Sequence, residues 1–421
     1  MKKTVFGLTV ASLALLANTA FADTQLKLVE VITSPARTET LKEMVSAYEA
    51  ANPGVTVEIV SLPWGQAYEK LATMVAGGDV PDVVEMPDKW QALYAGAGKL
   101  ASLEDHIKAW EHGPTLTDKT MAMARLAGGT AYSVPYGFYL RAMFYNKKLL
   151  AEAGVAKPPK TMEEFHDALA KVSALDGKSG YCLRGSRGGH SGWLMNAAAM
   201  NGSADFFTAD GKSTLNTPEA IKGYQELIDI YQEGLAPKDS VNWGFNEIVA
   251  GFYSGTCAFL DQDPDALIAV QERMDNADFA VIPMPTGPHG KAYPTIGFVG
   301  WSIFNTTEHE SDAWKLVAHL SDPENNKVWA RKVGVIPVHT GADKDPYFQT
   351  EQFAGWFETL NGADYVPLVL PHQLEGFGYF ADTIAVETAQ QALLGEITAK
   401  EMADQWADYM NEEYTKWKAN Q

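Results

Sequence analysis

The sequence predicts an α/β protein with two lobes, and three observations lead to that prediction. The chain has 421 residues, of which 46% are apolar and 20% charged. This length exceeds the roughly 250 to 300 residues beyond which a single core usually divides. Strand and helix signals alternate near the N-terminus, and two short segments that contain Pro and Gly, 133–137 and 293–297, lie beside extended apolar runs. We interpret these two segments as crossings between the lobes.

The alternating elements begin with a predicted strand over residues 26–32. A helix follows, in which apolar residues from Leu41 to Tyr48 recur at helical spacing. A second strand over 55–59, a helix over 68–75 and a third strand over 81–85 come next. This β-α-β-α-β order predicts a mostly parallel sheet flanked by helices, with ligands bound beyond the carboxyl ends of the strands.

Two more helices are predicted further along the chain from their N-terminal signals. Thr161 and Glu164 form a capping box, and Thr217 with Pro218 opens a second helix. The apolar stripes of both helices, including their tyrosines, are expected to pack in the core.

The first 22 residues have the pattern of a cleavable signal peptide. Lys2 and Lys3 precede an apolar stretch over 5–17, and residues 20–22 read Ala-Phe-Ala, which fits a cleavage site. The apolar stretch is shorter than the ~20 residues that a membrane span needs. We therefore expect export to the periplasm, with a mature chain that starts at Asp23.

Charge and motif content exclude several function classes. The 33 Lys and Arg residues against 53 Asp and Glu give a net charge of −20, which opposes binding to nucleic acid or anionic lipid. The sequence contains no H-E-x-x-H, G-x-S-x-G, P-loop or complete dinucleotide fingerprint. Carboxylate pairs such as Asp261 with Asp263, or Asp79 with Asp82, could serve a glycosidase, but so many acids form such pairs by chance. We expect a binding protein rather than an enzyme, with no cofactor.

The two cysteines, Cys182 and Cys257, permit a disulfide in an exported chain. Both lie in short apolar segments, where a free buried cysteine would also fit. The sequence therefore leaves the pairing open. It contains no C-x-x-C and no Cys/His cluster, so no metal site is expected.

Tryptophans near Gly, Pro or polar neighbours indicate a small-molecule site. A flat ring can lie against the apolar face of a sugar while polar side chains bind its hydroxyls. The alternative is that these rings cap the edges of the core. The tryptophans concerned are Trp64, Trp90, Trp193, Trp243 and Trp301.

Several segments resemble the extracellular solute-binding proteins of carbohydrate ABC importers, the group that includes the maltose- and glycerol-3-phosphate-binding proteins. The matching segments are YEAANPGVTVEIV at 48–60, GGDVPDVVEM at 77–86, YSVPYGFYLRAMFYNKKLL at 132–150, the segment 297–330 that begins GFVGWSIFN, and VGVIPVH at 333–339. The resemblance implies a two-lobed periplasmic-binding-protein fold, with residues 23–134 and 297–337 in one lobe and residues 135–296 and 338–421 in the other. Such lobes close on a ligand about a hinge, and the closed form is recognised by a membrane permease.

The resemblance also assigns candidate ligand contacts, taken position by position. They lie in the loops after the first three strands, beside the two crossings, in the loop around residues 184–193, after the strand at 257–260, and in the segment 375–380. The candidates are Arg37, Trp64, Gln66, Asp88, Tyr136, Arg141, His190, Trp193, Asp261, Trp301, Phe377 and Tyr379.

The ligand class stays open at this level. A mono- to trisaccharide, a glycoside or a polyol is the leading expectation. Arg37, Arg184 and Arg187 fall in or near predicted cleft loops, so an anionic sugar or sugar phosphate is the alternative, unless Arg184 and Arg187 pair with the chain's own acids. We expect a monomer that presents its ligand to a permease, with a chemoreceptor as the other candidate partner.

Overall fold

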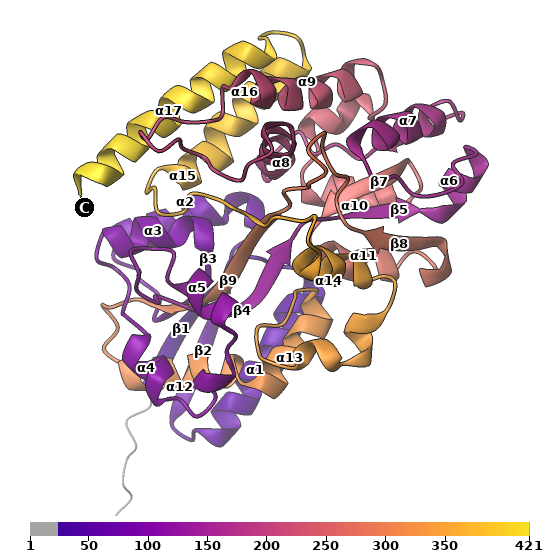
Figure 1. Ribbon diagram of the computed structural model, residues 1–421. Coiled ribbons are helices and arrows are strands. Elements are labelled where there is room, and N and C mark those ends of the chain that lie inside the picture. The colour runs from indigo at the N-terminus through magenta and orange to yellow at the C-terminus, as the bar shows by residue number, and fades with distance from the viewer. Residues whose placement is uncertain (1–23, 421) are drawn as a thin grey trace, which may run out of the picture.

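The computed structural model describes residues 24–420, so the predicted signal peptide lies outside the described residues. Two β-sheets, each flanked by helices, form the two lobes (Figure 1). Over residues 24–420 the structure contains no helix that is both long and apolar enough to cross a bilayer.

The first sheet has six strands in the order β10-β9-β3-β1-β2, and β4 also pairs with β9. The predicted strands β1 to β3 are all present, and β1 pairs in parallel with both β2 and β3. β9 runs antiparallel to β3 and β4, because β4 and β9 carry the chain between the lobes in opposite directions. The strands are β1 Thr24–Glu30, β2 Val55–Ser61, β3 Val83–Pro87, β4 Val134–Leu140, β9 Thr295–Ile303 and β10 Leu368–Val369.

The second sheet has the order β6-β7-β5-β8. β5 pairs antiparallel with β7 and β8, and only β6 and β7 run parallel. The expectation of a mostly parallel sheet in each lobe therefore does not hold for this lobe, because its central strand enters directly from a crossing. The strands are β5 Ala142–Asn146, β6 Ser179–Tyr181, β7 Cys257–Gln262 and β8 Phe279–Ile282.

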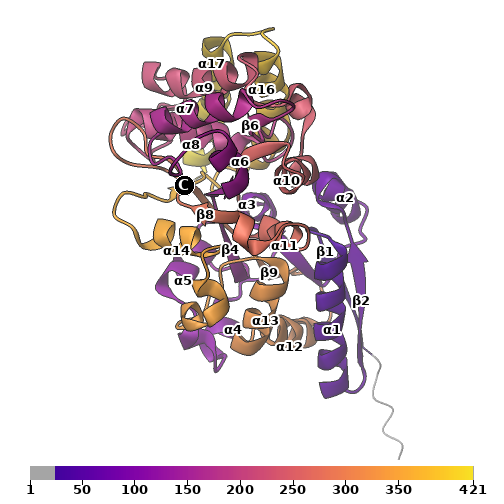
Figure 2. The same ribbon diagram turned by 90° about the vertical axis from the view of Figure 1, so that its right-hand side faces the viewer.

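Two groups of helices cover the sheets. α1, α12 and α13 contact one another beside the first sheet, whereas α9 packs on α8, α16 and α17 beside the second (Figure 2). The helices up to α9 are α1 Pro35–Ala51, α2 Trp64–Ala76, α3 Asp88–Gly96, α4 Glu104–Ala109, α5 Asp118–Ala124, α6 Lys147–Glu152, α7 Met162–Ser173, α8 His190–Asn201 and α9 Pro218–Gln232. The others are α10 Phe245–Tyr253, α11 Asp265–Gln271, α12 Glu310–Leu320, α13 Pro323–Val333, α14 Ala354–Asn361, α15 Phe377–Tyr379, the π-helical segment Phe380–Ile384, α16 Ala385–Leu393 and α17 Ala399–Ala419.

Local sequence explains where several of these helices begin. The Ser34 side chain accepts a hydrogen bond from the Arg37 amide, and Pro35 occupies the first turn of α1. Thr161 caps α7 and Thr217 caps α9 in the same way, as their sequences predict. These caps fix the loops that precede the helices, and the loop before α1 forms part of the site described below.

The first crossing is the step from β4 in the first sheet to β5 in the second. All of β4 belongs to the first sheet, and the chain passes into β5 at Arg141. The change of sheet therefore falls six residues beyond the boundary at 134/135, although the segment 133–137 does begin the crossing strand. The full residue ranges of the two lobes stay a prediction.

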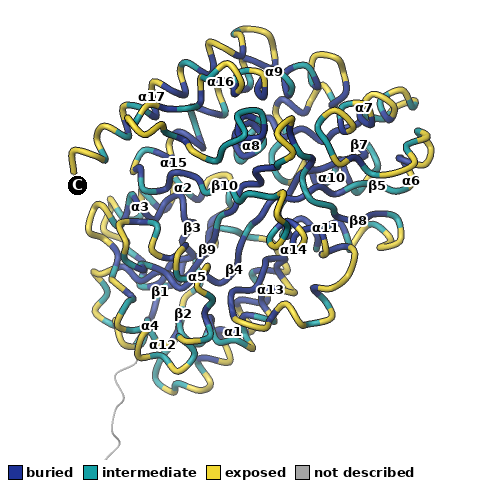
Figure 3. The backbone as a smooth tube through the Cα atoms, viewed as in Figure 1, coloured by how far each residue is buried: buried dark blue, intermediate teal, exposed yellow. Residues whose placement is uncertain are grey.

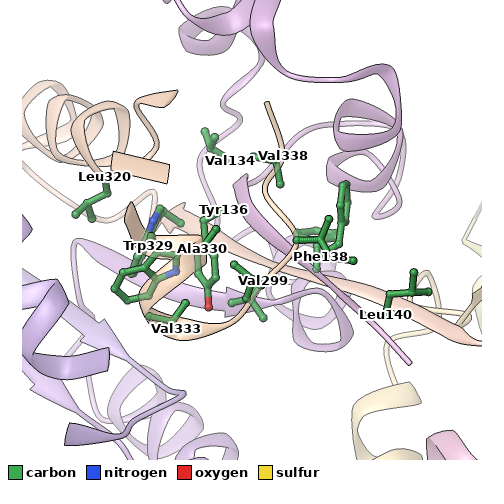
Figure 4. Close-up of a cluster of buried hydrophobic side chains, with 14 of the residues drawn as sticks. Val134, Tyr136, Phe138, Leu140, Val299, Leu320, Trp329, Ala330, Val333 and Val338 are labelled. Carbon is green, nitrogen blue, oxygen red and sulfur yellow. The ribbon is translucent and has the colours of Figure 1, made fainter. Parts of the chain in front are cut away.

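The core of the first lobe lies between β4, β9 and α13. Figure 4 shows Tyr136 of β4 beside Trp329 of α13, and their ring centroids are 5.5 Å apart. Trp301 of β9 completes the cluster at 5.3 Å from Tyr136 and 5.9 Å from Trp329. Buried residues are concentrated along the strands, whereas exposed residues lie on the outer faces of the helices (Figure 3).

Cys182 and Cys257 form a disulfide, so the pairing that the sequence left open is made in the structure. The bond ties the residue after β6 to the first residue of β7, and both cysteines are fully buried. It therefore fixes the edge of the second sheet below the loop that carries Arg184.

Candidate functional site: an interlobe cavity

A cavity of about 880 Å³ lies between the lobes. The loops that follow β1, β2 and β3 supply one wall through residues 32–37, 63–65 and 87–89. The second lobe supplies the opposite wall through Arg141, residues 184–191, residues 244–247 and residues 262–265. This volume lies within the range of about 300 to 1,000 Å³ that is typical of small-molecule sites. The predicted position at the carboxyl ends of the first three strands is thus where the cavity occurs.

Arg37 is one of the predicted residues that line the cavity, and its guanidinium is held from three sides. It donates to the Ile32 carbonyl at 2.7 Å, to the Glu85 carboxylate at 2.8 Å and to the Tyr136 hydroxyl at 3.0 Å. Glu85 also accepts from the backbone amides of Val31 and Ile32. This buried network fixes the shape of the loop after β1.

Tyr136 therefore has a different role from the predicted one. Its side chain is fully buried, hydrogen-bonds Glu85 and Arg37, and does not line the cavity. The neighbouring Tyr139 lines the cavity instead. The two hydroxyls lie 3.3 Å apart, and the sequence did not show which of the two rings reaches the cleft.

Trp64, also predicted, lines the cavity as a half-buried ring. It stacks on Trp90 with 5.4 Å between ring centroids and 18° between planes. Lys89 Nζ lies 4.7 Å from the centroid of the Trp64 ring. Trp90 is 1% exposed and forms the support of this wall rather than its surface. Gln66 is exposed on α2 and does not line the cavity.

Asp88 lines the cavity at the start of α3, as predicted. Its carboxylate accepts from the Phe298 amide at 2.9 Å and from the Lys89 amide at 2.7 Å. His372 Nε2 lies 3.3 Å from the same carboxylate, and His372 lines the cavity as well. The sequence did not single out His372, because no motif surrounds it.

Arg141 is the predicted contact at the first crossing, and it lines the cavity from the second lobe. Its guanidinium donates to the Asp261 carbonyl at 2.9 Å and to the Asp261 carboxylate at 3.2 Å. Asp261 also accepts from the Tyr181 hydroxyl and is 3% exposed. Asp261 therefore orients the Arg141 guanidinium but does not itself line the cavity, whereas Asp263 does.

His190 begins α8 and lines the cavity, as predicted, with 6% of its surface exposed. Burial and the positive charges of Lys89 and Arg141 hold the pKa of His190 well below its ordinary value, so the ring is neutral. Trp193 lies one turn later on the same helix and faces the core. Its ring centroid is 6.3 Å from Tyr224 and 6.4 Å from Trp406, so the expectation of a stacking surface in the cleft is corrected for this residue.

Three further predicted residues do not line the cavity. Trp301 is 1% exposed within the core cluster of β4 and α13. Phe377 is fully buried against His372 and Phe380. Tyr379 is 49% exposed on the surface near Tyr409. The short α15 turns its first ring inward and its last ring outward, so neither reaches the cleft.

Three more cavity residues that are absent from the predicted contacts, Arg184, Asp263 and Asp265, come from the second lobe. The sequence indicates Arg184 only as a contact for an anionic ligand and Asp263 only as a member of a chance carboxylate pair. It gives no signal for Asp265. Burial, followed by the charge of Asp263, raises the pKa of Asp265 to about 7, and burial also raises that of Asp263. Burial and the charge of Arg141 lower the pKa of Arg184 to about 10. Among the described residues, Arg184 and Asp265 form no ion pair, and Asp263 forms only a 3.6 Å contact with Arg141.

Metal binding has no support in the part of the chain that the structure describes. Among residues 24–420, no three His, Cys, Asp or Glu side chains are grouped so that they could hold a metal ion. The polar residues of the cavity instead present hydrogen-bond donors and acceptors to a small molecule.

The two lobes and the cavity between them define a protein that holds a small solute. The sequence model of the bacterial extracellular solute-binding protein family matches residues 34–327. The chain belongs to this family.

Curated relatives extend the similarity over most of the chain. A putative binding protein of Brucella abortus is 26% identical and covers 86% of this chain and 88% of its own. The sn-glycerol-3-phosphate-binding periplasmic protein of Pectobacterium atrosepticum is 28% identical, covering 77% and 75%. The maltotriose-binding protein of Pyrococcus abyssi is 26% identical, covering 75% and 67%.

Solved structures share the fold. The GacH receptor of Streptomyces glaucescens superposes with a TM-score of 0.83 at 22% identity and covers 93% of this chain and 99% of its own. Maltose-bound MalE3 of T. maritima superposes with a TM-score of 0.81 at 22% identity, covering 92% and 99%. The two-lobed fold predicted from the sequence is thereby confirmed.

Proposed function

We propose that the protein is the substrate-binding component of a carbohydrate ABC importer. It is exported to the periplasm, acts as a monomer, binds a sugar in the interlobe cavity and delivers it to a membrane permease. The cavity carries this proposal: the half-buried ring of Trp64 lines it together with charged hydrogen-bonding side chains from both lobes. Relatives named for maltotriose and for sn-glycerol 3-phosphate support a sugar or polyol ligand.

The charges around the cavity favour a neutral ligand over an anionic one. Most cationic side chains that line it already pair with a carboxylate of the chain, and an anion would have to displace those partners. The paired cations are Arg37 with Glu85, Lys89 with Asp382, Arg141 with Asp261, Arg187 with Glu69 and Arg273 with Glu272. We therefore propose a mono- to trisaccharide, a glycoside or a polyol, and not a sugar phosphate.

Contacts across the cavity fit capture by closure. Arg187 of the second lobe donates to the Gly65 carbonyl at 2.5 Å and also binds the Glu69 carboxylate on α2. A ligand that touches both walls adds to such contacts and so favours the closed form.

We propose no catalytic step. Of the carboxylate pairs considered from the sequence, Asp79 and Asp82 lie outside the cavity, and Asp261 is held by Arg141 and Tyr181.

A thermal-shift screen followed by calorimetry tests the proposal. A ligand at 100 times its Kd stabilises the native state by about 2.7 kcal/mol, so neutral sugars should raise the melting temperature while sn-glycerol 3-phosphate should not. Trp64→Ala should then weaken binding of the sugar hit by about 1 to 3 kcal/mol. Trp417→Ala on α17, outside the cavity, is the matched control and should bind as the wild type does. Failure of every sugar to bind would refute the proposal.

A further inference from the structure

Arg184 lines the cavity, and its side chain forms neither an ion pair nor a hydrogen bond with the part of the chain that the structure describes, whereas Arg37 leaves only Nη1 without a partner. Arg184 is 9% exposed, and its Nε atom is buried without a hydrogen-bond partner among the described residues. Arg37, Arg141 and Arg187 each pair with a carboxylate, whereas Arg184 forms no ion pair within residues 24–420. A buried donor without an acceptor is costly, and a ligand that supplies acceptor oxygens to the guanidinium would offset that cost.

The surroundings hold the Arg184 guanidinium in a fixed plane. A Cβ atom at Gly188 would lie only 2.4 Å from Arg184 Cζ, so the guanidinium rests against the bare backbone of Gly188, whose φ is +86°. On another side, Cζ lies 5.9 Å from the centroid of the Phe245 ring. Both residues line the cavity with Arg184. The guanidinium is thus positioned in advance by the backbone and an aromatic ring, and its polar edge is left for another partner.

Carboxylates on the same wall limit what that partner can be. Asp263 lies on the loop between β7 and α11, Asp265 is the first residue of α11, and both line the cavity. Asp263 Oδ2 lies 3.6 Å from Arg141 Nε, and the Asp265 carboxylate accepts from Gln262 Nε2 at 3.4 Å. Neither contact uses up the acceptor capacity of these groups. An anionic ligand group beside Arg184 would lie near these acidic groups, whereas a hydroxyl can donate to a carboxyl oxygen and accept from a guanidinium at once.

We propose that Arg184, Asp263 and Asp265 form a subsite that binds neighbouring hydroxyl groups of a neutral sugar. The guanidinium donates hydrogen bonds to the hydroxyl oxygens, and the carboxyl oxygens of the two aspartates accept hydrogen bonds from the hydroxyl groups. The subsite rests on the proposed function and specifies it, because it places ligand recognition on the second lobe opposite the ring of Trp64. Its specificity is for ligands with adjacent free hydroxyls over those with a phosphate or carboxylate group.

The test compares Arg184→Met with Arg184→Lys and with Arg125→Met. Arg125 pairs with Glu104 on the surface and does not line the cavity, so it controls for removal of an arginine. The probes are D-glucose, maltose and maltotriose, with sn-glycerol 3-phosphate as the anion, measured by calorimetry on the full mature chain. For the sugar that binds wild type best, Arg184→Met should lower affinity about 10- to 100-fold, Arg184→Lys less, and Arg125→Met not at all.

A second readout needs no ligand. Because the Arg184 donors are unsatisfied in the free protein, Arg184→Met should leave its melting temperature unchanged or raise it. A lower melting temperature together with unchanged sugar affinity would show that Arg184 is structural and overturn the subsite. Asp263→Asn and Asp265→Asn should also weaken sugar binding, since an amide oxygen is a weaker hydrogen-bond acceptor for a hydroxyl group than a carboxylate oxygen is.

The outcomes separate the subsite from the function. If the wild type binds a neutral sugar and Arg184→Met binds it equally well, the subsite is wrong while the proposed function stands. If the wild type binds sn-glycerol 3-phosphate and none of the neutral sugars, the preference for hydroxyl groups is wrong. If the wild type binds no probe at all, the proposed function fails and the subsite fails with it.

Discussion

Lys89 Nζ lies 2.8 Å from each carboxylate oxygen of Asp382, and both side chains are almost fully buried. Lys89 belongs to α3 beside the first sheet, whereas Asp382 lies in the π-helical segment that packs on α16 and α17. The same ammonium group lies over the ring of Trp64 at the cavity wall. This ion pair therefore joins the first lobe to the C-terminal helices beside the cavity.

Breaking this ion pair should loosen the closed arrangement. Lys89→Met leaves the Asp382 carboxylate buried without its partner, which costs about 3 to 5 kcal/mol unless the lobes open and hydrate it. We expect a larger radius of gyration by small-angle scattering and a lower melting temperature. Lys400→Met, which removes an exposed pair with Asp404 on α17, should change neither quantity measurably. An unchanged scattering curve and melting temperature for Lys89→Met would contradict the role of this contact.

The ion pair between Arg187 and Glu69, the second contact between the two walls, should contribute much less to sugar affinity. The side chains of Arg187 and Glu69 are 28% and 54% exposed, and the hydrogen bond from Arg187 lowers the pKa of Glu69. Exposed pairs are typically worth up to about 1 kcal/mol and are screened by salt. Arg187→Met should therefore change sugar affinity by less than about fivefold at low salt and by less still at high salt. A larger, salt-independent loss in calorimetry would show that Arg187 touches the ligand.

Burial separates two tryptophans that look alike in the sequence. Trp301 is packed against Tyr136 and Trp329, so Trp301→Ala should lower the free energy of unfolding by about 3 to 5 kcal/mol. Trp64 is half-buried at the cavity wall, so Trp64→Ala should cost clearly less stability. Denaturant unfolding of both variants checks this order. A greater loss of stability for Trp64→Ala than for Trp301→Ala would contradict the assignment of Trp301 to the core and of Trp64 to the cavity wall.

The disulfide should contribute to stability through the unfolded chain. Cys182 and Cys257 are separated by 75 residues, and closing a loop of that length stabilises the folded state by about 4 kcal/mol. Replacing both cysteines by serine should lower the unfolding free energy by that order. Equal stability of the oxidised and reduced wild-type protein would contradict a role for the bond in holding β6 against β7.

Asp265 should make the stability of the ligand-free protein depend on pH. Burial and Asp263 raise its pKa to about 7, above the value of the unfolded chain, so the folded state binds the proton more tightly. Its stabilising contribution is complete below the unfolded pKa and is lost as pH rises through about 7. The melting temperature of wild type should thus fall more between about pH 5 and about pH 7.5 than that of Asp265→Asn. Parallel pH profiles for the two proteins would contradict the shift.

The sequence predicted well those features that follow from chain direction. Parallel strands bring their carboxyl ends to one edge of a sheet, so the order of the elements was enough to place the loops with Arg37, Trp64 and Asp88 at the site. All three residues line the cavity. The helix caps at Thr161 and Thr217 were equally predictable, because capping depends on residues within one turn.

Side-chain direction was the part that the sequence did not settle. Trp193 lies beside Gly192 and Ser191, which made it look like a loop residue, yet it belongs to α8 and faces the core. Tyr136 and Tyr139 share a strand, and only Tyr139 lines the cavity. The sequence could not show that Arg184 lacks a partner among the described residues, because pairing depends on which distant residues pack around the side chain.

Hydrogen–deuterium exchange with and without the best-binding sugar tests most directly that the solute is held between the two lobes. We expect slower exchange in both walls: residues 32–37 and 63–65 of the first lobe, and residues 184–191 and 262–268 of the second. The outer helix α17 should exchange equally in both states. Protection confined to one lobe, or equal protection throughout, would contradict binding in the interlobe cavity.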